Sequence, residues 1–116
     1  MIDAVDQETA LRLKALGYPQ DYPNEDYLAW RHHGVLALCS GFNISTVRVT
    51  GAAAPSVLQA LDWLEREKGW WYRRFIGRWV AAHGTGRALV TLPAMPETPG
   101  ELLRLLLEKL EEANNG

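Results

Sequence analysis

Residues 69–79 read GWWYRRFIGRW, and the interpretation of the whole sequence depends on this stretch. It holds three of the chain's five tryptophans together with three arginines. The aromatic runs on either side of Ile76 and Gly77 predict a β-hairpin formed by residues 70–75 and 78–83. Such a hairpin can be a nucleic-acid-binding surface, a partner-binding patch or an ordinary ribbon whose aromatic side chains are buried.

The turn sets how the two strands of this hairpin pair. A two-residue turn puts the β-branched Ile76 at a positive φ, which is unfavourable, whereas a four-residue loop over 75–78 keeps the same register without that strain. On this register Arg74 is opposite Trp79. Successive side chains then alternate between two faces. One face carries Trp70, Tyr72, Arg74, Trp79, Ala81 and His83, and the other carries Trp71, Arg73, Phe75, Arg78, Val80 and Ala82.

Neither face of the hairpin is cleanly polar, unlike a sheet with one side in water. Two arrangements satisfy this pattern. Helices cover both faces in an α-β-α sandwich with the arginines at the rims, or one face of aromatic and arginine side chains stays open. Tryptophan, tyrosine and arginine are enriched at binding hot spots, so an open face would be suited to recognition.

The rest of the chain predicts helices around this hairpin. Apolar periodicity and capping residues indicate helices over 7–16, 55–68 and 99–112, the last beginning with a Thr98–Glu101 capping box. Further strands are expected over 27–31, 35–39, 44–50 and 87–92, although a helix from Asn24 to Cys39 is an alternative for the first two. The predicted fold class is α+β, with helices packed on an antiparallel sheet in a single domain, 1–116.

Composition excludes several classes of protein. The chain is 47% hydrophobic and 22% charged, as in soluble globular proteins, and its apolar runs are too short to span a bilayer. Residues 1–8 do not resemble a signal peptide, and the lone Cys39 excludes an internal disulfide and fits a reducing compartment. We therefore expect a cytoplasmic protein with no membrane association.

The sequence contains no recognisable catalytic or metal-binding motif. His32 and His33 are adjacent, so on a strand they point to opposite faces and cannot bind one metal ion together. Cys39 stands in an apolar run typical of a small buried residue, and the GTGR stretch at 84–87 fits a turn better than a phosphate-binding loop. We expect no enzymatic activity, no metal and no cofactor.

Charge is concentrated near the hairpin. Between Arg66 and Arg87 there are six basic residues and one acid, a local charge of +5, so the remainder of the chain carries −7. Residues 56–79 look like the recognition helix and basic wing of a winged-helix protein, which makes nucleic-acid binding through Arg73, Arg74, Arg78 and Arg87 the alternative function. The outward residues of that helix are not predominantly basic, and this disfavours the alternative.

Trp63 lies off the apolar stripe of the helix over 55–68, so it packs against another element or is exposed. Together with the hairpin it completes the predicted protein-binding set: Trp63, Trp71, Arg73, Arg74, Arg78 and Trp79. The expected partner is a protein, and a homodimer would also use an open aromatic face.

Three stretches carry a family resemblance: ETALRLKALGYPQ at 8–20, AAPSVLQALDWL at 53–64 and ELLRLLLEKL at 101–110. Together they resemble small uncharacterised proteins of phages and prophages. The resemblance implies a mobile-element origin and, by analogy with small accessory phage proteins, binding and inhibition of a host protein. It implies no catalytic residues.

Overall fold

The carboxylate of Asp6 begins the first helix, because its Oδ1 accepts a hydrogen bond of 2.8 Å from the backbone N–H of Thr9. The helix, α1, spans Gln7–Ala15 and buries Ala10 and Leu13. Gly17 follows with a φ of 100°, a left-handed conformation that suits glycine and ends the helix. The helix predicted over 7–16 is therefore confirmed apart from its last residue.

The computed structural model describes residues 4–20, 27–30, 34, 36–39 and 51–115. The chain divides into two compact units, residues 1–56 and 57–116, and each is described by itself. The expectation of a single domain stays a prediction. The strand expected over 44–50 lies outside the described residues, as do the side chains of His32, His33 and Cys39.

The first unit contains a three-stranded antiparallel sheet in the order β2-β1-β3. Strands β1, Tyr27–Trp30, and β2, Leu36–Cys39, pair with each other, so the strand interpretation of this region is confirmed over the helical one. The third strand, β3, is Ala52–Ala53, a small-residue stretch for which no strand was expected. The indole N–H of Trp30 donates to the carbonyl oxygen of Val5 at 2.7 Å, which ties this sheet to the segment before α1.

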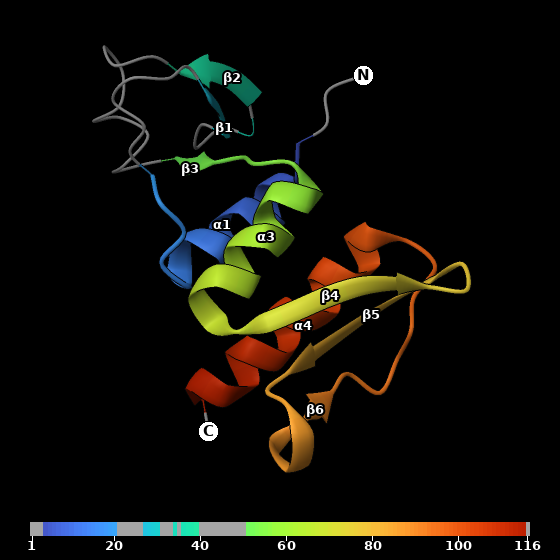
Figure 1. The fold of residues 1–116 in the computed structure, drawn as a ribbon. Coiled ribbons are helices and arrows are strands. Elements are labelled where there is room, and N and C mark those ends of the chain that lie inside the picture. Colours follow the sequence, from blue (N-terminus) through green and yellow to red (C-terminus); the bar gives the residue numbers. More distant parts are fainter. Residues whose placement is uncertain (1–3, 21–26, 31–33, 35, 40–50, 116) are drawn as a thin grey trace. The chain divides into compact units, whose positions relative to one another are not determined.

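The second unit begins with helix α3, Val57–Lys68, and continues into the predicted hairpin (Figure 1). Gly69, at a φ of 77°, separates α3 from strand β4, Trp70–Phe75, which pairs with strand β5, Arg78–His83. The register is the predicted one, with Arg74 opposite Trp79. The division of side chains between the two faces of the hairpin is therefore confirmed.

The third strand of this sheet is shorter than predicted. Residues 87–92 include part of a 3₁₀ turn, η1 (Gly86–Ala88), followed by strand β6, Val90–Thr91. The chain then runs on beside β5, where Leu92 N–H donates to the oxygen of Ala81 at 3.1 Å and Trp79 N–H donates to the oxygen of Pro96 at 2.8 Å. These two bonds satisfy groups along the β5 edge although the intervening residues form no regular strand.

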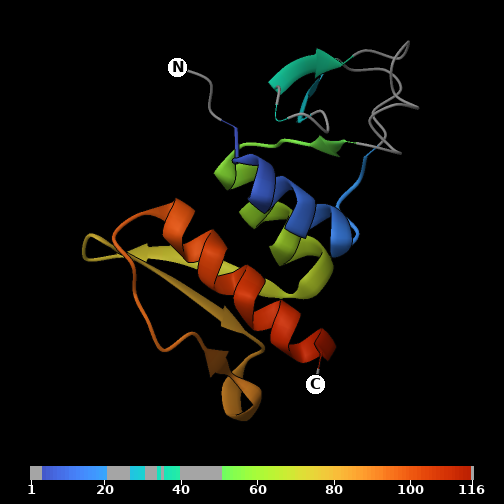
Figure 2. The same ribbon diagram turned by 180° about the vertical axis from the view of Figure 1, so that it is seen from behind.

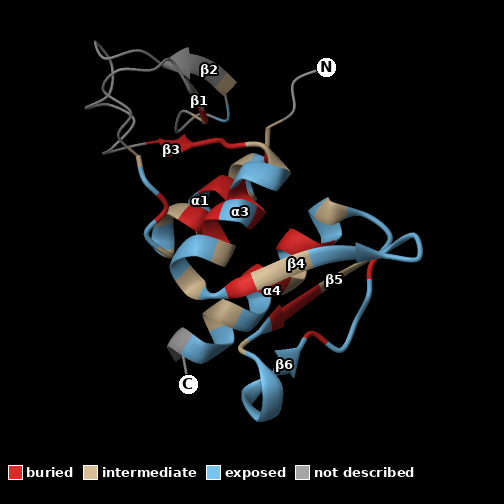
Figure 3. Cartoon of the chain, viewed as in Figure 1, coloured by how far each residue is buried: buried red, intermediate tan, exposed pale blue. Residues whose placement is uncertain are grey.

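Helix α4, Pro99–Asn115, covers one face of the hairpin, behind β4 and β5 in Figure 1 and in front of them in Figure 2. The Glu101 N–H donates to Thr98 Oγ1 at 3.3 Å, which confirms one of the two bonds of the expected capping box. The helix packs against α3 and β5 and buries four leucines completely or almost so, shown in red in Figure 3: Leu102, Leu103, Leu106 and Leu107. The fold class is α+β, as predicted.

The hairpin closes through a two-residue turn at Ile76 and Gly77, with φ values of 49° and 73°. Positive φ at both central positions is the pattern of a type I′ turn, which matches the twist of a hairpin. A four-residue loop would have spared Ile76, but the structure pairs Phe75 with Arg78 directly. A β-branched residue therefore sits in the left-handed region, where its Cβ substituents crowd the backbone.

We predict that Leu106→Ala lowers the free energy of unfolding by about 2–5 kcal/mol, because it leaves a cavity among fully buried side chains. Leu110→Ala serves as the control, since Leu110 is only half-buried and its truncation costs less. Urea denaturation of both variants measures the difference. Equal losses would contradict the placement of the core under α4.

We predict that Ile76→Asn stabilises the protein by about 1 kcal/mol, because asparagine tolerates positive φ and Asn-Gly is the preferred type I′ pair. The melting temperature should rise by about 4 °C. Leu89→Asn is the matched control: it also removes an exposed apolar side chain, but from a residue at a φ of −69°, so no strain is relieved. A gain in the control and none in Ile76→Asn would show that the turn is unstrained.

Candidate interaction surface

The two faces of the hairpin have different surroundings. The inner face is the one that holds the buried Trp70 and Ala81, and its Tyr72 hydroxyl donates to Asp62 Oδ1 of α3 at 2.7 Å. The ring of Tyr72 stacks on that of Trp79 with the centroids 6.1 Å apart. The inner face therefore contains buried side chains and is used for packing, while α3 is contacted from both faces, by Tyr72 and by Arg73.

The outer face is the opposite one, with Trp71, Arg73, Phe75, Arg78, Val80 and Ala82. Only Ala82 on this face is buried; Trp71 and Val80 are half-buried, and the other three are exposed. Of the two predicted arrangements, the described residues of this unit adopt the one in which a face of aromatic and arginine side chains stays open.

Side chains on the outer face are held in place by short contacts. The guanidinium of Arg73 lies 5.5 Å from the ring centroid of Trp71 and pairs with Glu65 of α3 at 3.2 Å. The indole N–H of Trp71 donates to the oxygen of Gly84 at 3.3 Å. Cation–π contact and hydrogen bonding of this kind orient Arg73 and Trp71 before any partner binds.

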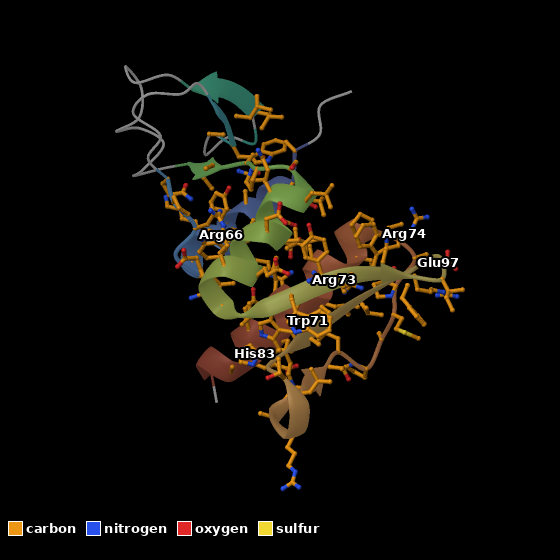
Figure 4. All side chains as sticks on the ribbon, viewed as in Figure 1. Arg66, Trp71, Arg73, Arg74, His83 and Glu97 are labelled. Carbon is orange, nitrogen blue, oxygen red and sulfur yellow. The ribbon has the colours of Figure 1, made fainter. Side chains whose placement is uncertain are left out.

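Arg78 is oriented in the same way toward the segment before α4. Its Nη1 donates to the oxygen of Met95 at 3.3 Å, and its Nη2 lies 3.4 Å from Glu97 Oε1. Figure 4 shows Trp71 and Arg73 along the hairpin, Arg74 and Glu97 toward its turn, and His83 at the other end. The outer face thus brings together three of the six predicted residues: Trp71, Arg73 and Arg78.

The other three predicted residues lie elsewhere. Trp63 is only 6% exposed, because α3 buries a wider arc than its apolar stripe indicates, so its indole is not a surface contact. Trp79 is half-buried on the inner face. Arg74 also belongs to the inner face but is exposed near the turn, and the described residues record no ion pair for it. Partner binding by this set stays a prediction.

Sequence reasoning missed an apolar cluster at the turn. Phe75 is 59% exposed, Ile76 is 86% exposed and Met95 is 52% exposed; we call these three residues the turn cluster. The carbonyl oxygen of Met95 accepts a hydrogen bond from Arg78, which is the cross-strand partner of Phe75. In the sequence, Phe75, Ile76 and Gly77 predict a turn, and this short stretch does not indicate an exposed apolar surface.

No group of three histidine, cysteine, aspartate or glutamate side chains could hold a metal ion in the described part of the chain. His83, at the end of β5, is exposed and its ring centroid lies 5.5 Å from that of Trp70. Among the same residues, none of the helices has the length and apolarity that crossing a bilayer requires.

Comparisons of this chain with protein-family models, with curated proteins and with solved structures find no match.

One titratable group of the hairpin is shifted. Desolvation, followed by the hydrogen bond to Asp62, raises the pKa of the Tyr72 phenol from 10.0 to about 12. Below pH 10 the phenol is protonated in both the folded and the unfolded chain. As the pH rises from 10 toward 12 the unfolded chain loses its proton first, so the contribution of Tyr72 to stability is lost over this interval.

We predict that Tyr72 ionises with a midpoint near pH 12, measured as the tyrosinate absorbance of the wild type minus that of Tyr72→Phe. Asp62→Asn should move this midpoint down toward 10, because it removes the carboxylate charge that favours the protonated phenol, although the amide oxygen can still accept a hydrogen bond. A wild-type midpoint at 10 would mean that the α3 contact does not form in solution.

Proposed function

We propose that this chain is a non-enzymatic protein-interaction module that binds its partner through the outer face and the turn of the hairpin. The observation that supports this is the asymmetry of the ribbon. Its inner face supplies the core, whereas its outer face keeps Arg73 and Arg78 exposed and oriented by Glu65 and Glu97, beside the exposed ring of Phe75. Preorganised side chains lose less entropy on binding, which favours affinity.

The resemblance to phage and prophage proteins extends this proposal. A small accessory protein of a mobile element acts in the cytoplasm of its host, and inhibition of a host protein is the function that such proteins commonly serve. The partner we propose is therefore a bacterial protein, and the binding itself is the inhibitory event. This step depends on analogy and not on the hairpin.

Nucleic-acid binding is less well supported by the same geometry. Arg73 and Arg78 lie on the outer face, each beside a carboxylate of the chain. Arg74 lies near the turn while Arg87 lies in η1, beyond the opposite end of β5. Phosphate contacts supply most of the non-specific affinity for a duplex, and these four arginines are divided between the turn, the outer face and η1.

The test is quantitative affinity enrichment from a bacterial lysate with the full chain as bait. The outer-face pair Arg73→Ser and Arg78→Ser should reduce the recovery of at least one protein about tenfold, because arginine is a frequent hot-spot residue. The matched pair Arg66→Ser and Arg87→Ser removes the same charge from exposed residues outside the outer face and should change recovery little. Circular dichroism verifies that both variants are folded.

Two further measurements separate the alternatives. Anisotropy titration with a labelled oligonucleotide at low salt should show no binding, and sedimentation should show no dimer that the outer-face pair disrupts. A salt-sensitive complex with the oligonucleotide, lost equally in both arginine pairs, would favour nucleic-acid binding. Recovery of the same proteins by the wild type and the outer-face pair would refute the proposal.

A further inference from the structure

The turn cluster is the most exposed apolar surface of the second unit. Ile76 is 86% exposed, and Phe75 and Met95 each expose more than half of their surface. Figure 1 shows the β4–β5 turn extending past the N-terminal end of α4, so the turn that carries Phe75 and Ile76 projects from this unit. A convex apolar projection fits a concave apolar site on another molecule.

The backbone at Ile76 is a second, independent observation. A φ of 49° is rare for any β-branched residue, and the next residue, Gly77, already supplies the glycine that such a turn requires. Asparagine or glycine at position 76 would relieve the strain. The isoleucine side chain has no compensating contact in the fold, because it is almost fully exposed. Strain of this kind is found at functional sites, where the side chain is needed for something other than folding.

The charges beside the turn cluster indicate the chemistry of its partner. Arg74 and Arg78 are the residues that precede Phe75 and follow Gly77, and both are exposed. Glu97 pairs with Arg78 at 3.4 Å in an exposed ion pair that costs little to exchange. An apolar projection between two arginines is complementary to an apolar pocket whose rim is acidic.

The tryptophans of the hairpin are less suited to this role. Trp79 stacks on Tyr72, and Trp71 donates its indole N–H to Gly84 while Arg73 lies over its ring. Both tryptophans are half-buried, so part of each ring is already in contact with other residues of the fold. We therefore expect the turn cluster to make the apolar contact with the partner, and the arginines beside it to orient the partner.

We infer that the turn cluster is the anchor of this interaction module and that Ile76 enters an apolar pocket with an acidic rim on the partner protein. The inference rests on the proposed function, because it names the kind of partner that the same hairpin binds. The partner that we propose is a folded protein and not a lipid surface.

The experiment begins with the full chain carrying the substitution Phe75→p-benzoylphenylalanine, irradiated in a bacterial lysate. Mass spectrometry identifies the linked protein and the segment that is linked. That protein is then purified, and calorimetry gives its dissociation constant for the wild type, for Ile76→Asn, Ile76→Val and Leu89→Asn, for the outer-face pair Arg73→Ser with Arg78→Ser, and for Arg74→Ser at several salt concentrations. Melting temperatures are measured on the same samples, so that weakened binding is not mistaken for unfolding.

We expect Ile76→Asn to weaken binding more than tenfold while its melting temperature rises, a combination that a purely structural turn residue would not produce. Ile76→Val should weaken binding only about fourfold, the effect of one buried methylene, and Leu89→Asn should leave it unchanged. The linked segment should line an apolar pocket with aspartate or glutamate at its edge, and Arg74→Ser should reduce the salt dependence of binding.

The other outcomes overturn the inference in distinguishable ways. If Ile76→Asn binds as the wild type does while the Arg73 and Arg78 pair does not, the anchor is wrong and the proposed function stands. If all of these variants bind equally, the proposed function fails as well. Binding to vesicles of phosphatidylcholine and phosphatidylglycerol that is lost in Ile76→Asn would assign the turn cluster to a lipid surface. A linked segment without acidic residues would refute the predicted rim.

Discussion

Burial of leucine side chains under the hairpin is the interaction on which the second unit depends. Leu102, Leu103, Leu106 and Leu107 are removed from water where α4 lies on the inner face, and each contributes about 1.5–3 kcal/mol of hydrophobic free energy. Because side chains alternate along a strand, covering one face sends every second residue to the other. The open outer face is thus a consequence of how the core is built.

The same constraint explains the local order of the outer face. Alternation sends Arg73 and Arg78 outward, where they reach carboxylates on the neighbouring elements α3 and the segment before α4. These exposed ion pairs add little to stability. Their effect is to hold two guanidinium groups in fixed positions on either side of Phe75, which is an arrangement suited to recognition.

The strained turn can be understood together with this arrangement. Direct pairing of Phe75 with Arg78 leaves only two residues to close the hairpin, and the second is glycine. The first could have been asparagine or glycine at no steric cost, yet it is isoleucine. At this position the backbone conformation is unfavourable for the side chain that the sequence supplies. In an otherwise consistent sequence, such a conflict is expected where function rather than folding selects the residue.

Much of the architecture could be predicted from short-range patterns. Asp6, Gly17 and Thr98 act at helix ends through their own neighbours, so their roles depend on sequence alone. The burial of Trp63 and the shortening of the third strand could not be predicted in this way. Both depend on packing against elements that are distant in the sequence. Periodicity within one element does not show which distant element will pack against it.

By itself the sequence determined the caps at Asp6, Gly17 and Thr98, the hairpin and its register, and with the register the two sets of residues that face apart; α3, however, begins two residues later than predicted and α4 ends three residues later. Tertiary structure alone decided which set is covered, that Trp63 is removed from the surface, and that the backbone of Met95 lies within reach of Arg78. The physical reason is the range of the forces involved. Capping and alternation act between residues close along the chain, whereas burial is set by contacts between segments that only folding brings together.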